Sequence, residues 1–207
     1  MNLVIGVMGT ADGPLSDGVT RRGRELGRVI AARGCTLITG ACPGISYHAV
    51  QGAREAGGLV VGVSPALSRE EHEARYHSPV DGFDVIIYTG SGLMGREVAT
   101  IRSSDIVVIA GGRSGTLGEF AIAHDEGRLI GVLSGTGGIA DEIDRLVPLC
   151  TKGTGAVVRY ADEPEALIDD LLEYYRTEHF KHPSIFARED AARAVTLLGG
   201  RAILSRP

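Results

Sequence analysis

Residues 106–119, which read IVVIAGGRSGTLGE, constrain the fold of this chain more than any other stretch. Five apolar residues run without alternation into glycines, and a helical pattern begins a few residues later. Such a run is typical of a strand buried on both faces, and the glycines allow a tight turn into a helix. The first turn of that helix has free N–H groups and a partial positive charge, so it is a natural seat for a phosphate.

The same order of apolar run, glycine loop and helical stripe repeats along the chain. Strands are predicted at residues 3–8, 36–39, 59–63, 84–88, 105–110 and 129–133, with an edge strand at 156–159. Helices are predicted from residue 16 or 17 to 34 and at 45–56, 96–102, 117–126, 139–146 and 163–178, and residues 64–82 are expected to be irregular. Alternating strands and helices indicate an α/β fold, a doubly wound and mostly parallel sheet with helices on both faces.

The length of 207 residues fits one domain with a sizeable core. We expect a single domain at residues 1–180 and a C-terminal tail at 181–207. Thirty glycines are about twice the usual share of roughly 7%. They cluster behind apolar runs, where the backbone turns sharply or approaches a ligand.

The formal net charge of −5 argues against a nucleic-acid partner, because such proteins usually carry a basic surface. Three cysteines without CxxC spacing fit free thiols in a reducing compartment. The sequence has neither a basic, apolar leader nor an apolar run approaching 18 residues. We therefore expect a cytoplasmic protein without a membrane span.

Ligands of open parallel sheets bind beyond the carboxyl ends of the strands. Five glycine-rich loops are expected at that edge, namely residues 9–13, 40–44, 90–95, 111–115 and 134–138. Residues 90–95 match GxGxxG, but the next predicted strand ends in Ala110-Gly111, where a dinucleotide site needs an acid. No lysine follows the glycines of residues 111–115, so this is not a Walker loop. The sequence predicts a phosphate cradle without a metal, NAD or other cofactor.

Two charged residues near this edge have both a functional and a structural interpretation. Glu119 could face the ligand, or it could be the last residue of a capping box that begins at Thr116. Arg96 is expected at a helix N-terminus, where a cation opposes the macrodipole and an anionic ligand or Glu119 would compensate it. The alternative is an exposed Arg96 that pairs with Glu97 or another nearby acid.

Several of these stretches resemble the LOG-type Rossmann family. The family includes cytokinin riboside 5′-monophosphate phosphoribohydrolases, molybdenum-cofactor carrier proteins and the DprA/Smf-related group. Its enzymes carry an arginine nine residues before an aspartate, then a strand and PGGxGTxxE, and Arg96, Asp105 and Gly115-Thr116 with Glu119 match this order. Residues 9–11, 40–46 and 58–65 resemble the family's other loops. The likeness covers residues 1–178.

The resemblance implies a site and a reaction. It implies Arg96 and Glu119 as the catalytic pair. The substrate- and phosphate-binding residues would be Gly9, Thr10, Gly40, Gly44, Gly112, Ser114, Gly115 and Thr116. The reaction would be hydrolysis of the N-glycosidic bond of a nucleoside 5′-monophosphate, most readily a purine monophosphate, to free base and ribose 5-phosphate. The resemblance also implies a homodimer.

The chain departs from the enzymes at three places. Arg113 replaces a glycine of the PGG motif, Leu93-Met94 replaces Met-His, and Glu97 replaces a lysine. Residues 88–90, which lead to Gly95-Arg96, look more like the carrier-protein and DprA-related branch of the family. This likeness implies an alternative from another class, a non-catalytic carrier for a nucleotide-like or molybdopterin-type phosphate ligand. Binding of single-stranded DNA, by analogy with DprA, is a third hypothesis that the acidic balance disfavours.

Overall fold

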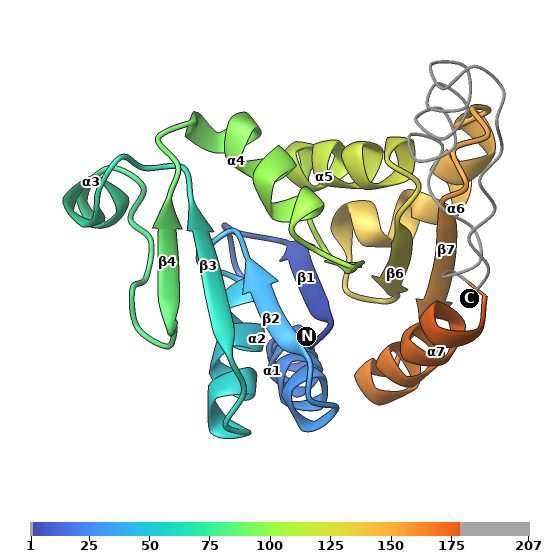
Figure 1. Cartoon of the computed structure of the whole chain (residues 1–207), viewed down its shortest axis with the longest axis horizontal. Coiled ribbons are helices and arrows are strands. Elements are labelled where there is room, and N and C mark those ends of the chain that lie inside the picture. The colour runs from blue at the N-terminus through green and yellow to red at the C-terminus, as the bar shows by residue number, and fades with distance from the viewer. Residues whose placement is uncertain (1, 179–207) are drawn as a thin grey trace, which may run out of the picture.

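The computed structural model describes residues 2–178, which form one parallel sheet flanked by helices (Figure 1). The strand order is β4-β3-β2-β1-β5-β6-β7, and all neighbouring strands pair in parallel. The strands are β1 (Val4–Gly9), β2 (Thr36–Thr39), β3 (Val60–Ser64), β4 (Val85–Tyr88), β5 (Ile106–Ala110), β6 (Leu129–Leu133) and β7 (Val157–Ala161). The predicted doubly wound α/β fold is confirmed, with β7 at an edge as expected.

Helices cover both faces of the sheet. They are α1 (Asp17–Ala32), α2 (Ile45–Glu55), α3 (Arg69–Ala74), α4 (Gly92–Arg102), α5 (Ser114–Asp125), α6 (Ile143–Leu146) and α7 (Pro164–Thr177), with short 3-10 helices at Gly138–Glu142 and Val147–Leu149. Alternate residues of β5 separate two cores: Ile106 and Val108 pack with α1, α2 and α7, whereas Val107 and Ile109 pack with α4, α5 and α6. A strand buried on both faces explains the unbroken apolar run.

Two helices begin earlier than the sequence pattern predicts. The expected starts were residues 96 and 117, but α4 begins at Gly92 and α5 begins at Ser114. Glycines 92, 95, 115 and 118 lie inside these helices. Glycine is a poor helix former, so the sequence pattern did not include them, but it is tolerated where packing stabilises the helix. The predicted place of Arg96 at a helix N-terminus is therefore wrong, because it lies one turn inside α4.

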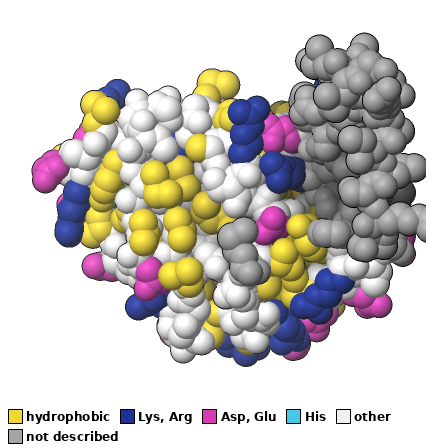
Figure 2. Space-filling model, viewed as in Figure 1, with side chains coloured by type: hydrophobic (Ala, Val, Ile, Leu, Met, Phe, Trp, Pro, Cys, Tyr) yellow, Lys and Arg dark blue, Asp and Glu magenta, His cyan; other side chains and the backbone are white. Residues whose placement is uncertain are grey.

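Other differences concern the periphery. Residues 64–82, expected to be irregular, contain α3, and the helix expected at 139–146 is divided into a 3-10 turn followed by α6. Hydrophobic side chains gather over β3 and β4 (Figure 2), where Val85 and Ile87 of the edge strand β4 are about half exposed. No helix in the described part of the chain is long and apolar enough to cross a membrane. The tail expected at 181–207 lies outside the described residues.

Candidate functional site

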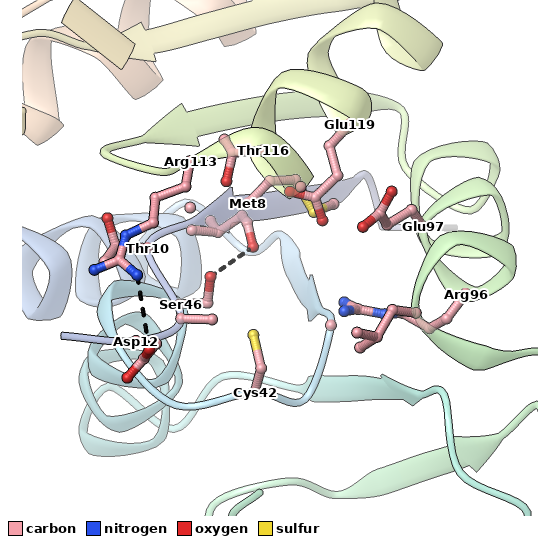
Figure 3. A pocket seen from close by; sticks show the side chains of 16 residues that line it. Met8, Thr10, Asp12, Cys42, Ser46, Arg96, Glu97, Arg113, Thr116 and Glu119 are labelled. Carbon is pink, nitrogen blue, oxygen red and sulfur yellow. Dashed lines mark hydrogen bonds and ion pairs between the residues drawn. The ribbon is translucent and has the colours of Figure 1, made fainter. Parts of the chain in front are cut away.

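A cavity of about 200 Å³ opens at the carboxyl ends of β1 and β2, beside the first turns of α4 and α5 (Figure 3). The chain runs from β1 outward to β4 and then returns through α4 to β5 on the other side of β1. This reversal is the topological switch point at which doubly wound sheets bind ligands. Seven of the predicted site residues line the cavity: Gly9, Thr10, Gly40, Arg96, Gly115, Thr116 and Glu119.

Three predicted binding residues do not line it. Gly112 donates its N–H to Thr10 Oγ1 at 2.7 Å, and its φ of 99° suits glycine. Gly44, with φ of 80°, packs against the Thr10 carbonyl at the start of α2. Ser114 is exposed at the first position of α5. Gly44 and Gly112 thus shape the loops around Thr10.

Not all of the five glycine-rich loops that were predicted at the carboxyl edge of the sheet reach the cavity. The loop at residues 134–138 instead supports the loop after β5: Thr136 Oγ1 accepts the Gly111 N–H at 2.8 Å. Of the GxGxxG stretch at residues 90–95, Leu93 alone lines the cavity. Gly92 and Gly95 of that motif lie within α4. The motif therefore does not form a dinucleotide loop at this cavity.

The N-terminus of α5 faces one end of the cavity. Leu117 donates its N–H to the Arg113 carbonyl at 2.9 Å and is the first intrahelical donor, so the N–H groups of Ser114, Gly115 and Thr116 have no acceptor within the helix. Gly115 and Thr116 line the cavity beside Thr10. Arg113 and Asp12 form an exposed ion pair at 3.7 Å at this end (Figure 3). The backbone donors and the helix dipole favour an anion here.

Arg96 lies at the opposite end and is only 6% exposed. Its guanidinium takes the space above Gly40, where a Cβ would overlap Nη1. It also lies close enough to the Cys42 thiol to lower the thiol's pKa, although burial raises that pKa more. Arg96 Nε is buried without a hydrogen-bond partner in residues 2–178. The interpretation of Arg96 as an exposed residue paired with Glu97 is therefore wrong.

Glu119 is buried, with an exposed fraction of 7%. The N-cap of α5 is Arg113 and makes no side-chain capping bond, so Thr116 is not the cap and the capping-box interpretation of Glu119 is wrong. The carboxyl makes no hydrogen bond or ion pair within the described residues. Burial raises its pKa from 4.5 to about 7, Arg96 opposes this shift, and Glu97 adds to it. Such a group can accept or donate a proton near neutral pH.

Glu97 and Cys42 also line the cavity, although the sequence did not predict them as site residues. Glu97 is 8% exposed and lines the cavity, and burial raises its carboxyl pKa while Arg96 lowers it. The spacing of four residues from Leu93 could have indicated that both share a helix face. Cys42 follows Ala41, whose φ of 50° is rare for a residue other than glycine. No sequence pattern signals that conformation.

The cavity is thus divided electrostatically. One end offers backbone N–H groups of α5, the other offers the Arg96 guanidinium and the Glu119 carboxyl, and the Glu97 carboxylate lies beside Gly115 and Gly118 of α5 (Figure 3). Unpaired buried ionisable groups that converge on one cavity are typical of functional sites. The arrangement can hold a phosphate at one end and a hydroxyl- or amino-bearing group at the other.

Comparisons with known proteins agree with the fold. An uncharacterized protein of Archaeoglobus fulgidus is 34% identical over 129 residues, which are 62% of this chain and 78% of the relative. The molybdenum cofactor binding protein of Rippkaea orientalis is 28% identical (TM-score 0.69, 84% of this chain and 98% of that one). The molybdenum cofactor carrier protein of Chlamydomonas reinhardtii is 29% identical (TM-score 0.65, 83% and 99%).

A more distant likeness extends to the fold alone. DNA processing protein A of Helicobacter pylori, studied for its binding of single-stranded DNA, is 18% identical (TM-score 0.57, 83% of this chain and 80% of that one).

The model of the SLOG cluster4 family matches residues 2–168. The resemblance to LOG-type proteins is confirmed, and the chain belongs to the SLOG cluster4 family.

Proposed function

We propose that this protein binds a nucleoside 5′-monophosphate in the cavity and hydrolyses its N-glycosidic bond to free base and ribose 5-phosphate. The observation that carries the proposal is the position of Glu119, a buried carboxyl group without a bonding partner in residues 2–178. It lies one helical turn from the anion-binding end of the cavity and faces the same space as Arg96 (Figure 3). A purine monophosphate is the substrate that we favour.

The phosphate would lie at the N-terminus of α5. Gly115 and Thr116 offer N–H groups there, and Gly9 of β1 lines the cavity at a point where a Cβ would overlap the Ala110 carbonyl of β5. A hydrogen bond to a charged group contributes roughly 1.5–3 kcal/mol. A few such bonds hold one phosphate without a metal.

The chemistry would follow from the opposite end. As the bond from C1′ to the base breaks, positive charge develops on the ribose, and the ionised Glu119 would stabilise it and hold the ribose hydroxyls. Water adds its oxygen to C1′, its proton passes to Glu119, and Glu119 returns that proton through solvent to the departing base nitrogen. Arg96 would balance negative charge on the leaving base.

Replacing Glu119 tests this assignment. We expect Glu119→Ala to reduce release of adenine from AMP by at least roughly 10²–10³-fold, because a preorganised electrostatic group is lost. The matched control is Asp125→Asn, which removes an exposed acid of the same helix that pairs with Lys152. The control should keep wild-type turnover. Unchanged adenine release in Glu119→Ala would refute the mechanism.

A second candidate is a non-catalytic carrier of a nucleotide-like or molybdopterin-type phosphate ligand. It is favoured by the similarity to two molybdenum cofactor proteins over nearly their whole length. In a carrier, the α5 N-terminus would bind the phosphate and Arg96 would bind another anionic group. Thermal stabilisation by ligand without any product would favour this candidate over the hydrolase.

A further inference from the structure

Glu97 is a second buried acid in the cavity and has no part in the proposed reaction. It is 8% exposed, and its carboxylate makes no hydrogen bond or ion pair within the described residues. Burying an acid without a partner is unfavourable, so such a group usually marks a ligand or a reaction. Figure 3 shows its carboxylate pointing toward Glu119 and the cavity.

The two helices together hold this carboxylate in place. Glu97 comes from α4, and it faces the glycine surface of α5. A Cβ on Gly115 would lie 3.5 Å from Glu97 Oε1, and a Cβ on Gly118 would lie 3.4 Å from Oε2. The carboxylate therefore lies beside the first turns of α5 with room for little more than a methyl group between them, and it makes no bond to that helix.

Leu93 adds an apolar surface next to this acid. Leu93 and Glu97 are four residues apart on α4 and both line the cavity. A carboxylate beside an apolar side chain suits a flat heteroaromatic ring that carries hydrogen-bond donors on its edge. With the phosphate at the first turn of α5, the base of a nucleotide would lie toward α4.

The charges at this end of the cavity select for a donor. Glu97 and Glu119 are two acids against the single guanidinium of Arg96. A carboxylate accepts hydrogen bonds, whereas a carbonyl oxygen on the base would face it with no proton between them. A base that offers no donor would leave the buried acid unpaired, and the site would therefore bind it much more weakly.

We propose that Glu97 is a specificity-determining residue that accepts a hydrogen bond from an amino group of the base. The cavity then selects nucleotides with amino-substituted bases over their oxo analogues. This inference rests on the proposed nucleotide site, but it does not depend on turnover.

Calorimetric titration of AMP and IMP, which differ at the 6-amino and 6-oxo positions, tests it directly. We expect wild-type protein to bind AMP roughly ten- to a hundredfold more tightly than IMP. CMP and UMP provide a second amino and oxo pair. In Glu97→Gln the preference for AMP over IMP should fall to about threefold or less. The amide still accepts a bond from the 6-amino group, but it can also donate one to the 6-oxo group. Asp125→Asn should keep the wild-type ratio.

The outcomes separate the two proposals. Equal binding of AMP and IMP by wild-type protein, or an unchanged ratio in Glu97→Gln, would overturn the role of Glu97 alone. A preference for AMP without base release supports the role of Glu97 and contradicts hydrolysis. Binding of neither nucleotide overturns both proposals. The wild-type ratio needs no variant, so the test holds even where Glu97→Gln fails to fold.

Discussion

The charge state of Glu119 links function to stability at the scale of a single residue. Burial raises its pKa in the folded protein from 4.5 to about 7. The folded state therefore binds more protons than the unfolded state between these values, and the free energy of unfolding falls as pH rises through this window. Above pH 7 the buried carboxylate is ionised and destabilises the fold by about 3 kcal/mol. Activity and stability make opposite demands on this side chain.

Glu119→Gln should reveal that cost. We expect the variant to exceed the wild type in unfolding free energy by about 3 kcal/mol more above pH 7 than below pH 4.5, because the amide cannot ionise. Urea denaturation of both proteins at a pH on each side of the window measures the difference. A constant difference between variant and wild type at both pH values would show that Glu119 titrates as an ordinary exposed acid. Arg96, Glu97 and Cys42, which face it, are the same in both proteins.

Close packing between helices α1 and α2 holds in place the loop that follows β2 and lines the cavity. A Cβ on Gly27 of α1 would overlap the Ala49 carbonyl of α2, and a Cβ on Gly52 would overlap the Arg24 carbonyl. The two helices thus approach each other backbone to backbone. The loop from Gly40 to Gly44 leads directly into α2, and Gly40 and Cys42 of this loop line the cavity together with Ser46 of α2.

Gly27→Ala should destabilise the protein by about 1–3 kcal/mol, because the added methyl group forces the helices apart. Gly18→Ala is the matched control on α1, where the nearest atom to the added Cβ is Ser16 Oγ at 3.9 Å. The control should gain about 0.5–1 kcal/mol from the higher helix propensity of alanine. Thermal or denaturant unfolding distinguishes the two. Equal effects of both substitutions would contradict close helix contact.

The strands could be predicted from the sequence, but the starts of α4 and α5 could not. Unbroken apolar runs such as residues 106–110 have one good interpretation in a glycine-punctuated chain. Helix starts depend on packing: Gly92 and Gly115 are poor helix formers, yet both lie in first turns because α4 and α5 pack on the sheet and on each other. Because α5 begins at Ser114, Thr116 is not at the cap position, and Glu119 faces the cavity instead of capping the helix.

The whole molecule explains why the candidate site was predicted only in part. Residues that end neighbouring strands, such as Gly9 and Thr10, could be placed because parallel topology brings strand ends together. Glu97 and Cys42 could not, because their positions depend on how α4 packs over α5 and on a left-handed residue at Ala41. The loop at residues 134–138 also follows a strand, but its Thr136 side chain accepts a hydrogen bond from the Gly111 N–H and supports the loop after β5.

Base release is the central claim for the whole molecule, and it is tested most directly by incubating purified protein with AMP and with adenosine. The products to quantify are adenine and ribose 5-phosphate. Because the α5 N-terminus would anchor the phosphate, we predict equimolar adenine and ribose 5-phosphate from AMP and at least roughly tenfold slower adenine release from adenosine. No adenine from AMP, or equal release from AMP and adenosine, would contradict the account.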